Sequence, residues 1–283
     1  MEITNQRLLD RLLYEMQYRN YSERTIETYR KSLALVSKSL QKPLDKITSE
    51  ELKKYLHQRI VEESISTSCV NQFISAYKLL QTDVLKLEWE TIRIKRPRRE
   101  KKLPTVLSQQ EVARLISCTT NIKHRALLML AYSAGLRREE LQKIKSSAID
   151  SQRMMVHVVQ GKGKKDRYTI LSDKTLEMLR VYYKMFRPKT YLFESQVGKG
   201  CFLSSSTLTE IVKNSAQKAG IKKTVSFHTL RHCFATHLLE QGVNLKIIQQ
   251  FMGHNSLKTT SIYLHLANIS PSSISSPLDF MDI

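Results

Sequence analysis

The stretch MVHVVQGKGKKDRYTIL, residues 155–171, decides the fold class, because here an otherwise helical pattern changes to a strand pattern. Residues 155–159 and 167–171 contain the β-branched and aromatic side chains that favour strands. Between them, Gly161–Asp166 is punctuated by glycine, which is typical of a hairpin connection. We therefore expect a small antiparallel β-sheet within a mainly α-helical chain.

Apolar residues at helical spacing fill most of the sequence on both sides of this hairpin. Upstream, Ser108-Gln-Gln-Glu111 is a capping-box pattern that begins a folding unit just after Pro104. Glycines that can end helices are Gly135, Gly220, Gly242 and Gly253. The spacing predicts helices at 122–134, 137–144, 173–186, 206–219, 228–241, 244–252 and 256–266.

The first 91 residues show helical spacing throughout. Apolar residues recur every three or four positions from Leu8 onward, and Ser22, Thr48 and Ser66 occupy positions where N-caps are expected. We expect a compact bundle of four helices there.

A run of positive charge follows this bundle. Residues 92–103 contain a single acidic residue, Glu100, among Arg93, Lys95, Arg96, Arg98, Arg99, Lys101 and Lys102. Because desolvating so many like charges costs free energy, we expect an exposed linker between two domains, 1–91 and 104–269. The tail 270–283 ends in apolar residues that either dock on a neighbouring protomer or fray.

The overall charge points to a polyanionic partner. The 283 residues include 46 Lys and Arg against 26 Asp and Glu, a formal net charge of +20. Such a field attracts nucleic acid, although a merely solvated basic surface is the alternative. No apolar run approaches the ~20 residues of a membrane span. The four dispersed cysteines fit reduced thiols, and we expect a cytoplasmic protein with no membrane association and no cleaved leader.

Several polar side chains near the end of the sequence have the chemistry of a phosphodiester site. His228 and Arg231 are three residues apart and share a helix face, while His254 and Tyr263 lie on later helices. Guanidinium groups offset charge on phosphate oxygens, imidazoles exchange protons and a phenol can attack phosphorus. Taken singly, each of these residues also has an ordinary explanation as a cap, a core residue or half-buried surface.

Metal binding is the other chemistry to weigh. His228 and His232 have the i, i+4 spacing of zinc-binding helices, but no third ligand stands out nearby and Arg231 would repel a cation. We expect no metal and no cofactor.

Four ordered motifs resemble the tyrosine recombinase family, also called the phage integrase or Xer-like family. They span about 104–266, and the helical first part resembles the family's core-binding, SAM-like domain. One position departs from the pattern: Phe227 stands where many members carry proline, which concerns the start of the helix. The motifs are Ser133–Arg137 with Glu140-Leu141, Gly161–Arg167, His228–His232 with Leu238-Leu239, and Met252–His254 followed by Thr259–Tyr263.

The resemblance implies a mixed α/β catalytic domain and a role for each matched residue. Tyr263 would be the nucleophile, and Lys162 would protonate the departing 5′ oxygen. Glu140 would brace Arg137. The remaining implied groups are Arg137 and Arg231 on the scissile phosphate, His228 in proton exchange and His254 in support of the phosphate. The cations of residues 92–103, with Lys164 and Lys165, are candidates for contacts with the DNA backbone.

The implied activity is site-specific recombination of double-stranded DNA through a covalent 3′-phosphotyrosine. Four protomers would act on two DNA sites, without metal or ATP, and an accessory DNA-binding protein or a partner recombinase is a further partner to consider. Two alternatives stay open. A type IB topoisomerase would use a similar residue set to relax DNA, and a DNA-binding accessory protein would keep the charge without the chemistry.

Overall fold

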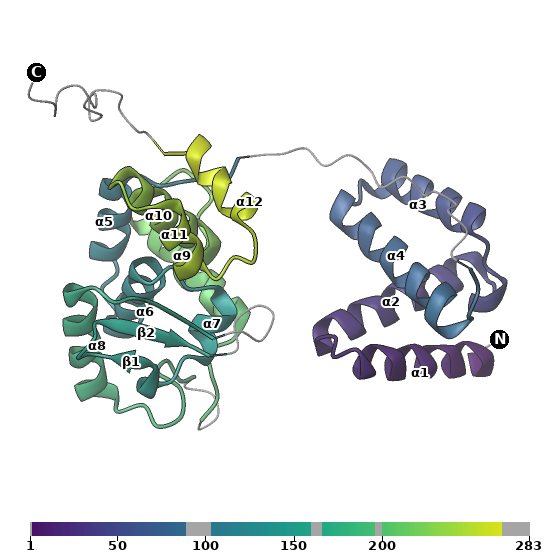
Figure 1. Cartoon of the computed structure of the whole chain (residues 1–283), viewed down its shortest axis with the longest axis horizontal. Coiled ribbons are helices and arrows are strands. Elements are labelled where there is room, and N and C mark those ends of the chain that lie inside the picture. The colour runs from purple at the N-terminus through teal and green to yellow at the C-terminus, as the bar shows by residue number, and fades with distance from the viewer. Residues whose placement is uncertain (1, 89–102, 160–165, 196–199, 268–283) are drawn as a thin grey trace, which may run out of the picture. The chain divides into compact units, whose positions relative to one another are not determined.

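The computed structural model describes residues 2–88, 103–159, 166–195 and 200–267, and the chain divides into two compact units, Met1–Lys101 and Lys102–Ile283 (Figure 1). The proposed linker cations fall within 89–102, outside the described residues. The hairpin connection with Lys162, Lys164 and Lys165 and the tail 270–283 also lie outside them.

The first unit is the expected bundle of helices. Side-chain oxygens of Ser22, Thr48 and Ser66 accept hydrogen bonds from backbone N–H groups in the first turns of three of these helices, which confirms the predicted N-caps. The elements are α1 Glu2–Tyr18, α2 Glu23–Leu40, a 3₁₀ turn Leu44–Lys46, α3 Ser49–Glu63 and α4 Thr67–Leu79, which continues into a π-helical turn Leu80–Val84.

The second unit is also mainly helical, as predicted. The last expected helix, 256–266, divides into the short α12, Leu257–Thr260, and a 3₁₀ helix, η4, Ser261–His265. The other elements are α5 Gln109–Ser117, α6 Ile122–Ser133, α7 Arg138–Lys143, a 3₁₀ turn Ser146–Ala148, α8 Asp173–Phe186, α9 Ser205–Lys218, α10 Phe227–Glu240 and α11 Leu245–Met252.

The predicted hairpin strands are confirmed as β2, Met155–Val158, and β3, Arg167–Ile170, which pair antiparallel. A third strand, β1, Ile149–Asp150, pairs with β2 and completes a sheet of order β1-β2-β3. Two residues carry no periodicity, so the sequence did not reveal β1. The register places Val158 opposite Arg167, so Arg167 begins β3 at the end of the sheet nearest the hairpin connection.

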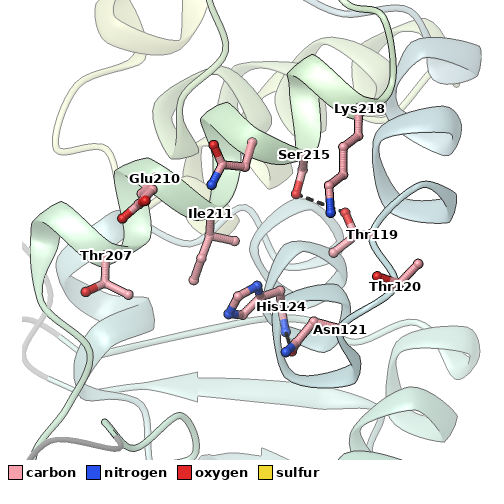
Figure 2. Close-up of a pocket in the computed structure, with 10 residues that line it drawn as sticks. Thr119, Thr120, Asn121, His124, Thr207, Glu210, Ile211, Ser215 and Lys218 are labelled. Carbon is pink, nitrogen blue, oxygen red and sulfur yellow. Dashed lines mark hydrogen bonds between the residues drawn. The ribbon is translucent and has the colours of Figure 1, made fainter.

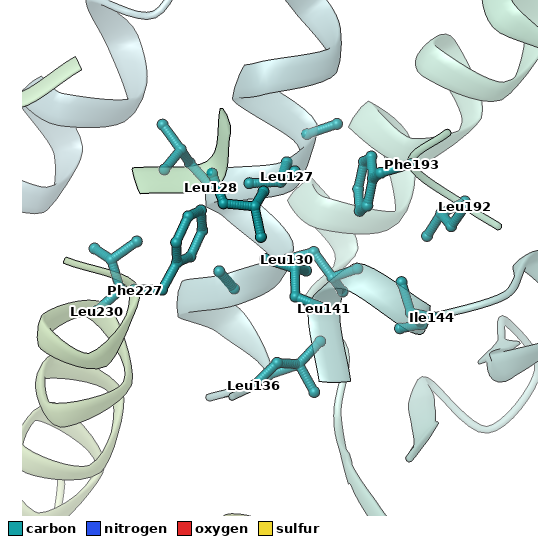
Figure 3. Packing of buried hydrophobic residues seen from close by; sticks show 14 of the residues in the cluster. Leu127, Leu128, Leu130, Leu136, Leu141, Ile144, Leu192, Phe193, Phe227 and Leu230 are labelled. Atoms are coloured by element: carbon teal, nitrogen blue, oxygen red, sulfur yellow. The ribbon is translucent and has the colours of Figure 1, made fainter. Parts of the chain in front are cut away.

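The core of the second unit surrounds α6. Its leucines pack against Phe227 and Leu230 of α10 and lie in the same buried cluster as Phe193 (Figure 3). Phe227 is the first residue of α10, which Ser226 caps, so the helix starts normally where many relatives of the resembled family carry proline. Because α6 is buried, the loop at its C-terminal end, which carries Gly135 and Arg137, has a fixed position beside α10.

The backbone that leads into this core is fastened to α10 as well. The Leu107 N–H donates to the Cys233 Sγ (3.1 Å), and the Leu107 carbonyl is 2.9 Å from His237 Nε2. The other ring nitrogen of His237 lies 2.8 Å from the Tyr132 hydroxyl on α6. Two side chains one turn apart therefore hold both polar groups of one backbone residue.

Gly135 ends α6 in the left-handed conformation, with φ +57°. A Cβ at this position would lie 2.3 Å from Cδ1 of Phe234 on α10, far inside normal contact. The close approach lets the Gly135 carbonyl accept a hydrogen bond from Arg231 Nη1 (2.5 Å). Glycine is therefore required here by both conformation and space.

We predict that Gly135→Ala lowers the free energy of unfolding by about 2 to 4 kcal/mol, because left-handed strain adds to displacement of the Phe234 ring. Urea denaturation measures the loss. Gly220→Ala is the matched control, since Gly220 has φ +66° but no atom within 4 Å of a built Cβ. Equal losses in the two variants would contradict a contribution from Phe234.

Candidate active site

Three arginines converge on the C-terminal end of α11. Arg167 Nε donates to the carbonyl of Phe251 (2.8 Å), and Arg137 Nη2 donates to those of Met252 (3.1 Å) and Gly253 (2.9 Å). Arg231 Nη2 also donates to the Met252 carbonyl. The last carbonyls of an α-helix lack partners within the helix and carry partial negative charge, so this end is a natural site for cations.

The buried carboxylate of Glu140 lies between the same arginines. It accepts two hydrogen bonds from Arg167 Nη1 and Nη2 (2.6 and 2.7 Å), and two from the backbone N–H and Nη1 of Arg137 (both 2.7 Å). Arg231 Nη1 is 3.9 Å away. Burial alone would raise the pKa of Glu140, but the hydrogen bonds and charges of Arg167 and Arg137 lower it to about 2.

Arg231 is the most deeply buried of the three, with a side chain only 2% exposed. Burial first, and then the charge of Arg137, lower its pKa to about 9, whereas Glu140 acts in the opposite direction. The guanidinium therefore stays protonated at neutral pH. Arg137 differs, because its side chain is 19% exposed and borders open space.

Tyr263 reaches this region from η4 but is only 1% exposed. Its hydroxyl lies 3.0 Å from Nδ1 of His232. Burial raises the pKa of Tyr263 to about 12, although Arg231 and Arg137 favour the phenolate. In this arrangement the phenol is protonated at neutral pH and has no access to solvent.

Three histidines surround the phenol and the arginines. Burial first, and then neighbouring positive charge, lower the pKa of His232 and of His254 to about 4. The exposed His228 also has a lowered pKa, because its ring is partly desolvated and lies near Arg231, Arg137 and Arg138. His254 is half-buried, its ring is nearly parallel to Tyr263 with centroids 6.5 Å apart, and its Nδ1 is 3.0 Å from the Thr260 hydroxyl. All three imidazoles are neutral at pH 7 and can act as hydrogen-bond partners or bases.

Two open cavities meet at Arg137. One, of about 420 Å³, is lined by Arg138, Thr209 and the exposed His228. The other, of about 720 Å³, lies beside α7 and β2 and is lined by Lys143, Lys145 and His157 among others. Arginine and lysine outnumber the acidic residues on each lining, where Glu139 borders both cavities and Glu140 borders the second, so both walls are net positive and suit a polyanion.

A third cavity, of about 390 Å³, has a different character (Figure 2). It lies between the start of α6 and α9, and its lining includes His124, Glu210 and Lys218. None of the residues that we expected to be catalytic lines it, so it is separate from the arginine cluster.

The structure brings together Arg137, Glu140, Arg231 and His254, places Tyr263 beside them through His232, and leaves His228 at the cavity mouth. Lys162 lies outside the described residues. Two residues of the cluster were not expected as members. Arg167 has no local sequence signal beyond its place after the hairpin lysines, and the sequence presents His232 only as a possible metal partner of His228.

The described residues contain neither a cluster of metal ligands nor a helix suited to a membrane. Within residues 2–88, 103–159, 166–195 and 200–267, no group of three or more His, Cys, Asp or Glu side chains could hold a metal ion. Among the described helices, none has the length and hydropathy needed to cross a bilayer.

Comparison with known proteins gives consistent matches along the chain. The sequence profile of the phage integrase family matches residues 105–269, and that of the phage integrase N-terminal SAM-like domain matches residues 8–91. A tyrosine recombinase of Thermosipho africanus is 35% identical, with 90% of this chain and 93% of that protein aligned. Tyrosine recombinase XerC of Lactobacillus leichmannii is 31% identical over 90% of this chain and 92% of its own length.

Solved structures give the same fold. The crystal structure of XerA recombinase aligns with a TM-score of 0.55 and 31% identity, covering 93% of this chain and 95% of that one. A lambda integrase dimer bound to a COC′ core site aligns with a TM-score of 0.73, covering 96% and 98% of the two chains. Its 19% identity makes it a comparison of fold alone.

The depressed histidine pKa values predict acid destabilisation. The unfolded chain binds protons on these histidines near pH 6.5, whereas folded His232 and His254 bind them only near pH 4. Stability present above pH 6.5 should therefore be lost as the pH falls toward 4. We predict that His232→Gln, which cannot titrate, reduces this loss by about 2 to 3 kcal/mol.

Urea denaturation between pH 7 and pH 4 measures the effect. His57→Gln, a substitution on an exposed face of α3, is the control for the loss of an imidazole as such. An identical pH dependence in wild type and His232→Gln would show that His232 is not protonated preferentially in the unfolded chain.

Proposed function

The chain belongs to the phage integrase family of tyrosine recombinases, and from that premise we propose that it cuts and rejoins specific sites in double-stranded DNA through a covalent bond between Tyr263 and a 3′ phosphate. One observation carries the proposal. Arg137 and Arg231, which are 94 positions apart in the sequence, converge on the end of α11 next to His254, and His232 of the same helix as Arg231 holds the Tyr263 hydroxyl.

The arginines supply the charge that phosphoryl transfer requires. Negative charge accumulates on the nonbridging oxygens in the transition state, and fixed guanidinium groups stabilise it without reorganisation. Arg137 borders both cationic cavities and is the more accessible of the two. Removal of one preorganised donor of this kind typically costs about 3 to 4 kcal/mol of transition-state stabilisation.

The nucleophile is protected in the described state. Because Tyr263 as a whole is only 1% exposed, its hydroxyl cannot reach a phosphate in duplex DNA until the segment that includes α12 and η4 moves. A phenol with a raised pKa also needs a base, and the neutral His228 at the cavity mouth is our candidate. His254 then supports the phosphate beside Arg137.

The remaining steps complete an exchange of strands. Lys162 donates a proton to the departing 5′ oxygen. The 3′-phosphotyrosine is itself a phosphodiester, so a 5′ hydroxyl of another strand can attack its phosphorus, break the bond to Tyr263 and restore the DNA phosphodiester without a nucleotide cofactor. Four protomers on two DNA sites would perform both exchanges, with linker and hairpin cations on the DNA backbone. Family membership and the charge of +20 support duplex DNA as the partner.

We predict that Tyr263→Phe abolishes covalent capture of DNA but changes DNA affinity by less than about threefold, because one buried hydroxyl contributes little to phosphate binding. The substrate is a nicked duplex whose sequence is first selected by binding from a random library. The measurement is the denaturation-resistant protein–DNA adduct, with and without a chelator, and we expect equal adduct in both.

Tyr183→Phe, an exposed position on α8, is the matched control and should form adduct normally. Adduct formation by Tyr263→Phe would identify another nucleophile. DNA binding without adduct by wild type would favour an accessory protein. Relaxation of a supercoiled plasmid without exchange between paired sites would favour a topoisomerase.

Lys162 is the proposed proton donor to the departing 5′ oxygen. Lys162→Ala should slow cleavage of an ordinary substrate by about 10² to 10⁴-fold, as expected for loss of a general acid. A substrate with sulfur in place of the 5′ leaving oxygen should restore the rate, because a thiolate departs without a proton. The same substrate should not rescue Arg137→Ala. Failure of sulfur to rescue Lys162→Ala would remove Lys162 from this role.

A further inference from the structure

Arg167 is a buried cation that the proposed reaction does not use. Its side chain is 8% exposed, and all three of its nitrogens have partners within the protein. Nη1 and Nη2 form a paired interaction with both oxygens of Glu140, and Nε donates to the carbonyl of Phe251. Three of its five N–H donors are directed at protein acceptors and the side chain is buried, so Arg167 is less available to a phosphate than Arg137, whose side chain is 19% exposed.

The partners of Arg167 are the same structures that hold Arg137. Arg137 is fixed at Nη1 by Glu140 and at Nη2 by the carbonyls of Met252 and Gly253 at the end of α11. Arg167 binds Glu140 on one side and the same end of α11, at Phe251, on the other. Arg137, Glu140, Arg167 and the end of α11 therefore form a closed loop of contacts. Both arginines bind Glu140, and both bind the carbonyls at the end of α11.

We propose that Arg167 is a positioning residue that holds Glu140 and the end of α11 so that Arg137 is fixed in the orientation needed for phosphate cleavage. This inference rests on the proposed function. Only the paired geometry of a guanidinium can bind both carboxylate oxygens and still reach the Phe251 carbonyl, so lysine is not equivalent at this position.

The side chain of Arg167 packs closely against the backbone of Gly253. Gly253 has φ +58°, and a Cβ there would lie 2.7 Å from Cδ of Arg167. The stem of Arg167 therefore lies directly against the backbone that carries one of the carbonyls bound by Arg137. The alternative is a purely structural tie between β3 and α11, and the experiment must separate it from positioning.

The first arm of the experiment measures single-turnover cleavage of pre-bound, selected duplex by Arg167→Gln, Arg167→Lys, Glu140→Gln and the double variant Arg167→Gln/Glu140→Gln. We expect Arg167→Gln to be slower by about 10²-fold, the cost of a small misplacement, with DNA affinity nearly unchanged. Arg167→Lys should recover part of the loss. The double variant should be no slower than the slower single variant, because both changes break one linkage.

The second arm measures the pKa of the Glu140 carboxyl by NMR in the free protein, with Glu140→Gln to assign the signal. The charged groups that face this carboxylate are Arg137, Arg167 and Arg231. Without Arg167, the pKa of the Glu140 carboxyl should rise. The fall of the cleavage rate at low pH, the acid limb of the pH–rate profile, should then move to higher pH. Loss of folded protein alone would lower activity without moving that limb.

Arg180→Gln, which removes an exposed arginine of α8, is the control for both arms and should change neither the rate nor the Glu140 pKa. Multiplicative losses in the double variant, or an unchanged Glu140 pKa in Arg167→Gln, would overturn the positioning role. If wild type forms no adduct, the proposed function fails, and the NMR arm still decides whether Arg167 controls Glu140.

Discussion

The gathering of three guanidinium groups, two of them buried, around the carboxylate of Glu140 is the constraint on which the second unit depends. Like charges repel strongly where water is excluded, so this cluster persists only because Glu140 and the carbonyls at the end of α11 offset the repulsion. Each surrounding element delivers one of these groups. The buried α6 ends at Gly135 so that the chain can turn inward at Arg137, β3 begins at Arg167, and α10 carries Arg231 past the Gly135 carbonyl.

Local signals allowed much of this architecture to be predicted from the sequence. Ser22, Thr48, Ser66 and Ser108 were recognisable as caps because capping depends on residues within one turn. The strand β1 could not be predicted because it is only two residues long. The 3₁₀ geometry of η4 could not be predicted because a helical pattern of apolar residues does not separate α from 3₁₀ helices. The roles of Arg167 and His232 in the cluster could not be predicted for another reason. Their partners, Glu140 and Tyr263, are 27 and 31 residues away in the sequence, and only tertiary structure joins them.

The geometry of Tyr263 keeps the proposed nucleophile apart from the site where it would react. The same burial that raises the pKa of the phenol also keeps it from solvent, and the neutral His232 fills its hydrogen-bonding capacity. Arg137 and Arg231, which bind the phosphate in the proposed reaction, are in contrast already held by Glu140 and by backbone carbonyls. Under that proposal the charge-stabilising groups are arranged in advance, whereas the tyrosine that would attack lies on the short element η4. A molecule free of DNA would then present only the anion-binding half of the proposed chemistry.

The two bonds from α10 to the backbone of Leu107 also have a practical meaning for protein engineering. A hybrid that joins the first unit of a relative to the second unit of this chain needs a junction near the boundary of the two units. A junction placed after Leu107 would pair a foreign backbone segment with Cys233 and His237, on the helix that also bears Arg231. A junction upstream of Leu107 keeps that fastening native, so the transplanted half retains its own anchor.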